Sequence, residues 1–96
     1  MEVFKMFGSI QLEQFKGLTT MPQKAATAFS AVEKLIGAKY LPLLYLGSQV
    51  VKGVNYYFIA EQTIMNQAQD RNVVILCVNE SGGKYVVVPH SIQKII

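Results

Sequence analysis

Hydrophobic residues recur at two different spacings along this chain, and the change divides it into a helical part and a strand-rich part. Between residues 25 and 36, apolar side chains return every three or four positions, as on one face of a helix. After Gly37, apolar runs alternate with short polar turns, which is typical of consecutive β-strands. The predicted helical face consists of Ala25, Ala28, Phe29, Val32, Leu35 and Ile36.

The residues that flank the helical segment are typical of helix ends. Thr20 and Gln23 stand three positions apart, as in a capping box, where each side chain bonds the backbone of the other residue. Pro22 suits the first turn, because the N–H that it lacks has no partner there. Gly37 favours the left-handed backbone that ends a helix. The sequence therefore predicts one helix between Thr20 and Gly37.

Five segments have the pattern of β-strands. The first lies within residues 8–19, where apolar and polar residues alternate over 9–13. Pro42 cannot donate a ladder hydrogen bond, so it must lie at a strand start, a bulge or an edge. The four strands predicted after the helix cover residues 40–48, 54–65, 72–79 and 84–89, and the last of these can resume toward Ile96.

The connections between these strands are short, which demands antiparallel neighbours. They cover residues 49–53, 66–71 and 80–83, and the last contains a glycine pair that suits a tight hairpin. One helix can cover one face of a sheet. We therefore predict a single α+β domain over residues 1–96, with a four- to five-stranded antiparallel sheet wrapped around one helix.

Two of the predicted strands are apolar on both faces, at residues 73–78 and 85–88. Such strands are usually buried on both sides, which favours an outer sheet face covered by a second copy or another partner. The competing interpretation is that β-branched residues stand on the surface for their strand propensity alone.

Composition narrows the class of protein. The chain is 51% hydrophobic and 16% charged with a single cysteine, which excludes a disordered tail and a disulfide scaffold. No apolar run approaches the roughly 18 residues of a membrane span, so no membrane partner is expected. The start shows no signal-peptide pattern, so the expected location is cytoplasmic unless a leader has been removed.

The net charge of +3 does not indicate nucleic-acid binding. Phosphate recognition usually needs clustered cations, often with arginine forks, whereas this chain has one arginine and isolated lysines. These lysines are Lys5, Lys16, Lys24, Lys34, Lys39, Lys52, Lys84 and Lys94.

Side chains for catalysis are scarce. Cys77 lies inside an apolar run, so we expect it to pack as a small buried hydrophobe rather than act as a nucleophile. His90 follows a proline among strand residues and is expected at the surface. No set of residues has the spacing of a zinc site, a carboxylate pair or a phosphate loop. We expect no enzyme activity, no metal and no cofactor.

One motif stands out. Residues 49–57 read Gln-Val-Val-Lys-Gly-Val-Asn-Tyr-Tyr, which resembles the first hairpin loop of the cystatin superfamily, Gln-Val-Val-Ala-Gly followed by Asn-Tyr. Members with this loop inhibit papain-like cysteine proteases. The predicted order of strand, helix and four strands is also similar to the cystatin fold. The resemblance implies that the loop enters a protease cleft without offering a cleavable bond.

The residue types suit such a role. Val50 and Val51 are stiff apolar side chains that lose little entropy when docked. Gly53 permits the backbone conformation that a hairpin needs. Gln49 can hydrogen-bond across the loop. Lys52 departs from the small residue usual in the family, so it would either clash in a narrow cleft or select an acidic one.

The resemblance implies two further protease contacts. One is a glycine of an N-terminal trunk, for which Gly8 and Gly17 are both candidates. The other is a second hairpin, which by strand order contains Ser81 and Gly82 and lacks the family's Pro–Trp pair. The main hypothesis is therefore a protease inhibitor. The alternative is a non-inhibitory module on the same fold that forms a homodimer through the apolar sheet face or by strand exchange at the loop.

Overall fold

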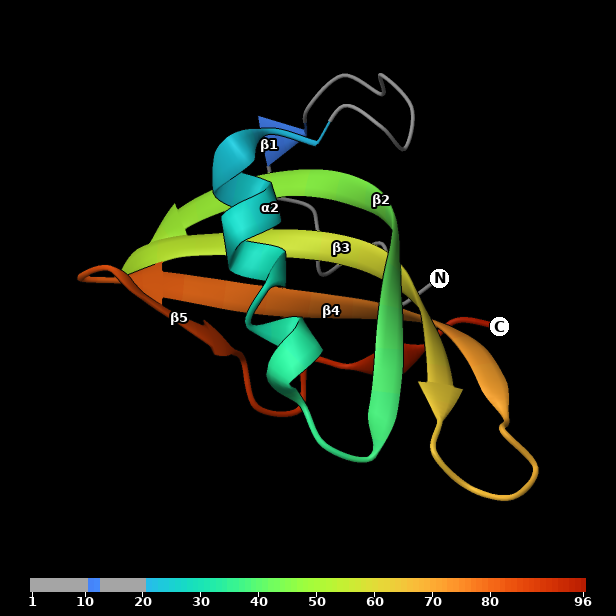
Figure 1. Ribbon diagram of the computed structural model, residues 1–96. Coiled ribbons are helices and arrows are strands. Elements are labelled where there is room, and N and C mark those ends of the chain that lie inside the picture. The colour runs from blue at the N-terminus through green and yellow to red at the C-terminus, as the bar shows by residue number, and fades with distance from the viewer. Residues whose placement is uncertain (1–10, 13–20) are drawn as a thin grey trace.

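The computed structural model describes residues 11–12 and 21–96, in which one α-helix lies across a curved antiparallel sheet (Figure 1). This arrangement confirms the predicted α+β class and the antiparallel sheet. The described elements are β1 (Gln11–Leu12), α2 (Gln23–Phe29), the 3₁₀ helix η1 (Val32–Lys34), β2 (Ala38–Val51), β3 (Gly53–Ile64), β4 (Arg71–Ser81), β5 (Lys84–Val87) and β6 (Gln93–Lys94).

The strands pair in the order β1-β2-β3-β4-β5, and β6 also pairs with β4. β5 and β6 share one edge of β4, so the chain after β5 resumes the same edge as predicted. A turn at Pro89 and His90 separates them. There the Ser91 hydroxyl accepts a hydrogen bond from the Cys77 N–H at 3.2 Å and lies 3.3 Å from the Cys77 carbonyl. This buried serine gives the Cys77 N–H a partner where the turn interrupts the ladder, while the Cys77 carbonyl also accepts a hydrogen bond from the Val88 N–H.

β2 is longer than predicted, because it begins at Ala38 and runs to Val51. Pro42 lies within it, and the pairing with β3 is irregular between Pro42 and Leu44. The proline therefore stands at a bulge, one of the three places predicted for it. The ends of β3, β4 and β5 differ from the predicted strands by at most two residues.

The helix is shorter than predicted. It ends at Phe29, and the chain tightens into 3₁₀ turns, in which the Ala31 N–H bonds the Ala28 carbonyl. The Ser30 hydroxyl also donates to the Thr27 carbonyl, an alternative bond that favours the end of a helix. As a result Ile36 is fully exposed, and its predicted place on the packed face is wrong.

The start of the helix also differs from the prediction. Pro22 occupies the N-cap position, with no side-chain cap bond, rather than the first turn. Thr20, the other half of the predicted capping box, lies outside the described residues. Gly37 has the expected positive φ, at +94°, and its carbonyl accepts a hydrogen bond from the Met65 N–H at 2.9 Å.

The core lies between the helix and one side of the sheet, here called the helix-facing side. Ala25, Ala28, Phe29 and Val32 are buried there, as predicted. Phe58 of β3 is fully buried, with its ring centroid 5.1 Å from that of Phe29 and the two rings inclined at 73°. The sheet contributes alternate residues to this cluster, namely Tyr56, Phe58, Ala60, Val74, Leu76 and Val78.

The opposite side of the sheet, here called the outer side, is partly apolar as well. Tyr57 and Cys77 form a second cluster there, with Leu46 and Val88 packed against it. Ile75 and Cys77 are only 2% and 4% exposed in a single chain. Burial of β4 on both sides is thus confirmed, and this part of the outer side needs no second copy to cover it.

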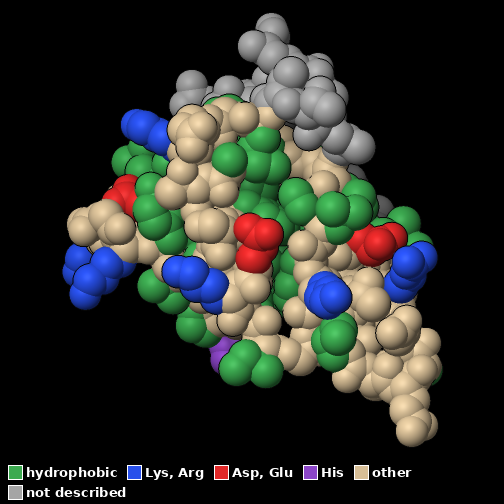
Figure 2. Space-filling view, in the orientation of Figure 1, with side chains coloured by type: hydrophobic (Ala, Val, Ile, Leu, Met, Phe, Trp, Pro, Cys, Tyr) green, Lys and Arg blue, Asp and Glu red, His purple; other side chains and the backbone are tan. Residues whose placement is uncertain are grey.

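Charged side chains lie singly among apolar ones over the face of the molecule that Figure 2 displays. This pattern agrees with the isolated lysines of the sequence. Within the described residues, no helix is long and apolar enough to cross a membrane.

Candidate functional site

The cystatin-like motif forms the turn between β2 and β3, and we call its residues 49–53 the prong. The two strands pair almost to the tip, with Gln49 opposite Asn55, Val50 opposite Val54 and Val51 opposite Gly53. Only Lys52 stands outside this ladder. The predicted five-residue loop is therefore corrected to a hairpin with a single unpaired residue.

Gly53 is the residue that permits this turn. Its φ of +89° is rarely adopted by residues that carry a side chain. A Cβ at this position would also lie 2.2 Å from the Glu80 carbonyl oxygen of β4, which is far inside van der Waals contact. Glycine is thus required twice, by its own backbone and by the neighbouring strand.

The two valines of the prong are exposed. Val50 and Val54 share the helix-facing side, and Val50 is 83% exposed because it lies beyond the end of the core. Val51 lies on the outer side and is 44% exposed. The prong therefore offers an apolar side chain on each of its flanks.

A network of polar side chains holds the outer flank of the prong. The Tyr57 hydroxyl donates to Gln49 Oε1 at 3.0 Å across β2 and β3. Asn79 of β4 donates through Nδ2 to Asn55 Oδ1 at 2.8 Å and to the Lys52 carbonyl at 3.3 Å. Burial is the main cause that raises the pKa of Tyr57, so its hydroxyl keeps its proton at neutral pH. These bonds fix the tip to three strands.

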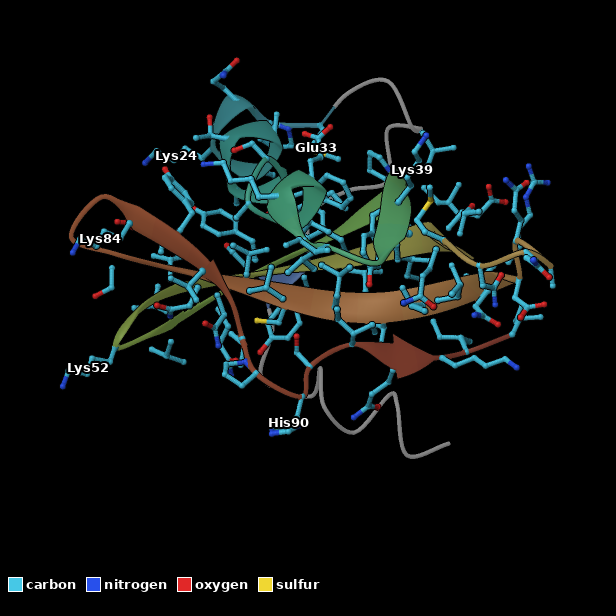
Figure 3. The ribbon with its side chains drawn as sticks, turned by 60° about the horizontal axis from the view of Figure 1, so that its bottom comes forward. Lys24, Glu33, Lys39, Lys52, Lys84 and His90 are labelled. Carbon is cyan, nitrogen blue, oxygen red and sulfur yellow. The ribbon has the colours of Figure 1, made fainter. Side chains whose placement is uncertain are left out.

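The second hairpin, between β4 and β5, lies beside the prong. The Cβ that Gly53 lacks would meet Ser81 as well as Glu80, which places the prong against the end of β4. Ser81 pairs with Lys84, and the turn between them has positive φ at Gly82 and Gly83, as predicted. Figure 3 shows Lys52 and Lys84 at the same end of the sheet. The structure therefore brings together seven of the predicted site residues, Gln49, Val50, Val51, Lys52, Gly53, Ser81 and Gly82.

Gly8 and Gly17, the two candidates for the trunk glycine, lie outside the described residues. β1 lies between them in sequence and pairs antiparallel with β2 at Ser48 and Gly47. Because β2 runs toward the prong, β1 runs away from it.

Cys77 and His90 lie where the sequence predicts them. Cys77 is buried, and burial raises the pKa of its thiol to about 11. The thiol is therefore protonated at neutral pH, which makes it a poor nucleophile. His90 is exposed, with a φ of +63°. Among the described residues, no group of three or more His, Cys, Asp or Glu side chains could hold a metal ion.

Sequence reasoning placed Glu80 in the second hairpin but missed its contact with the prong, and it missed Asn79 altogether. Both stand at the polar end of an apolar strand, where they look like ordinary residues before a turn. Their contact with the prong depends on the register between β3 and β4, which pairs Asn55 with Asn79 and Val54 with Glu80. That Asn79 lies opposite Asn55, the asparagine of the motif, is known only from this register.

The prong and the neighbouring turn thus form an exposed, partly apolar edge. Such an edge suits insertion into the concave surface of another molecule. Comparison with known proteins adds no assignment to this geometry. No protein-family model, no curated protein and no solved structure matches the chain.

Proposed function

We propose that this protein is a cystatin-like inhibitor of papain-like cysteine proteases that blocks the active-site cleft with the prong. The observation that carries the proposal is the 83% exposure of Val50 at the tip of a hairpin held by Gly53 and Asn79. An exposed valine on a fixed backbone has little entropy to lose on docking. It gains free energy from the water-exposed apolar surface that it buries.

The arrangement of elements supports the same family. A strand precedes the helix, five strands from β2 to β6 follow it, and β1 to β5 lie in sequence order in the sheet. This order is similar to that of the cystatin fold, in which a bent sheet wraps one helix. The motif lies at the β2–β3 turn, the position that the family's first hairpin loop occupies.

The prong is built to bind without being cleaved. A peptide bond reacts only when it reaches the nucleophile in a near-attack geometry. The residues on both sides of Lys52 are tied into the β2–β3 ladder, and the Lys52 carbonyl accepts a hydrogen bond from Asn79. Drawing this bond into an active site would break those contacts, so the prong occupies a cleft as a fixed obstacle.

Of the two additional contacts, the second hairpin is the one that the described geometry supports. The second hairpin lies beside the prong, and its small exposed residues Ser81 and Gly82 can approach a protease surface without steric conflict. For the trunk, Gly8 and Gly17 both stay candidates, because both lie outside the described residues.

Replacement of Val50 by asparagine tests this function. We expect the inhibition constant against a papain-type protease to rise about thirtyfold, the effect of losing an interface residue worth about 2 kcal/mol. Asparagine adds no charge beside Lys52, so the change reports lost apolar contact. The matched control is Leu41→Asn, because Leu41 is a 57% exposed residue of the same strand, paired with Glu61 far from the prong.

The control should change the inhibition constant less than twofold, and both variants should unfold at the same denaturant concentration as the wild type. Equal inhibition by the wild type and Val50→Asn would show that the prong is not part of the interface with the protease. Absence of inhibition by the wild type at micromolar concentration, across several papain-type proteases, would contradict the proposed function itself.

Strand exchange remains the second candidate, and the tight turn at Lys52 favours it. Opening that single unpaired residue would join β2 and β3 into one long strand that could pair with a second copy. This alternative predicts that sedimentation velocity at millimolar concentration detects a dimer. After dilution, the dimer should return to monomer only slowly. A protein that stays monomeric at that concentration would contradict it.

A further inference from the structure

The two hairpins at the prong end carry lysines that have no acidic partner among the described residues. Lys52 forms the tip of the prong and Lys84 begins β5, and both side chains are exposed. Within the part of the chain that the structure describes, neither ammonium group makes an ion pair. Figure 3 shows both side chains projecting beyond the same end of the sheet.

The acidic residue of the two hairpins, Glu80, lies on the opposite side of the sheet from Lys84. Glu80 lies opposite Val54 and Tyr85, on the helix-facing side, and its Oε2 accepts a hydrogen bond from the Gly83 N–H at 2.8 Å. Lys84 pairs with Ser81 and belongs to the outer side, where the neighbouring Asn79 is neutral. Lys84 thus lies on the outer flank of this end beside the partly exposed Val51, Lys52 forms its tip, and the opposite flank holds the exposed Val50.

We infer that the protease cleft this inhibitor fits has an acidic wall, which meets Lys52 and Lys84, and an apolar surface that receives Val50. The inference rests on the proposed function and adds the chemistry of the target. Two ammonium groups brought against an apolar or cationic wall would lose hydration without compensation. Against carboxylates they steer the encounter and fix which flank of the prong faces which wall.

The test is charge reversal at both lysines, K52E with K84E, measured against papain-type proteases whose cleft rims are acidic, neutral or basic. We expect wild-type inhibition to be strongest toward the acidic rim. The double variant should associate with that protease about 100-fold more slowly at low salt, because attraction becomes repulsion. The difference should nearly vanish near 1 M salt, where charges are screened beyond about 3 Å.

The matched control is K39E, which makes the same change of charge on an exposed lysine. Lys39 pairs with Thr63 on the outer side and lies at the far end of β2 from the prong (Figure 3). We expect its association rate to stay within about threefold of the wild-type rate.

The outcomes separate the inference from the function on which it rests. Inhibition that is equally strong toward acidic and basic rims, and unchanged in the double variant, would overturn the acidic wall while leaving the inhibitor function intact. Failure of the wild type to inhibit any of the proteases would overturn both. Loss of binding to phosphatidylserine vesicles in the double variant, without any protease inhibition, would assign the lysines to a lipid surface instead.

Discussion

Replacement of Gly53 by alanine should lower the free energy of unfolding by about 3 kcal/mol and abolish inhibition. The added Cβ would lie 2.2 Å from the Glu80 carbonyl oxygen, so β3 and β4 must separate at the prong. A residue with a side chain at a φ of +89° adds backbone strain of about 1–3 kcal/mol. Urea unfolding followed by circular dichroism measures the loss of stability.

Gly82→Ala is the matched control, because it tests a positive φ without the close approach. Gly82 has a φ of +60°, and a Cβ there would meet no atom within 4 Å. It should cost only the strain of a left-handed alanine, about 1 kcal/mol. Equal losses for the two variants would mean that the contact between Gly53 and Glu80 does not hold the prong.

A second readout separates the prong from the rest of the fold. The Asn79 side chain bonds the Lys52 carbonyl and Asn55, so displacement of the prong should move its amide resonances in nuclear magnetic resonance spectra. Residues of the core, such as Leu76, should keep their resonances under folding conditions. Inhibition should then fall at least 100-fold at temperatures where Gly53→Ala remains folded.

The sequence was sufficient for the main architecture because each layer has a distinct period. The spacing of Ala25, Phe29 and Val32 located the helix, and the pair Gly82 and Gly83 located a hairpin. The end of the helix was not predictable from spacing, because Leu35 and Ile36 continue the pattern after the backbone has left it. There a local side-chain bond at Ser30 and the docking of η1 outweigh periodicity.

Within the candidate site, the residues of the turn were predictable and their supports were not. Gly53 has a local signature, since a glycine at the end of a hairpin implies positive φ. Its second requirement comes from a carbonyl of β4, a strand distant in sequence. Asn79 also acts from β4, where its role depends on a register that the hydrophobic pattern fixes only to within two residues.

Truncation of Phe58 to alanine should destabilise the protein by about 3–5 kcal/mol, the usual cost of emptying a buried aromatic site. Phe58 is fully buried, and its ring packs edge-to-face on Phe29 of the helix and at 5.5 Å from Tyr45 of β2. It thus joins the helix to the centre of the sheet as part of the buried core cluster. Chemical unfolding measures the effect.

Two comparisons give this prediction its specificity. Phe58→Leu keeps much of the side-chain volume and should lower the free energy of unfolding by about 1.5 kcal/mol. Val86→Ala, at a 57% exposed position of β5, should lower it by less than about 0.5 kcal/mol. In a double-mutant cycle, leucine at both Phe29 and Phe58 should reveal a coupling of about 1 kcal/mol for the aromatic contact. Additive losses would show that the two rings contribute only through their separate burial.

The Phe58→Ala variant also tests whether the conformation of the prong depends on the packing of the core. Phe58 lies in the strand that begins at Gly53, but the prong has its own supports in Asn79 and in the Glu80 backbone. Under conditions where Phe58→Ala is still more than nine-tenths folded, we therefore expect its inhibition constant to stay within about threefold of the wild-type value. A parallel loss of inhibition and stability would mean that the prong is held by the packing of the helix on the sheet, and that the polar network of the outer flank contributes little to its shape.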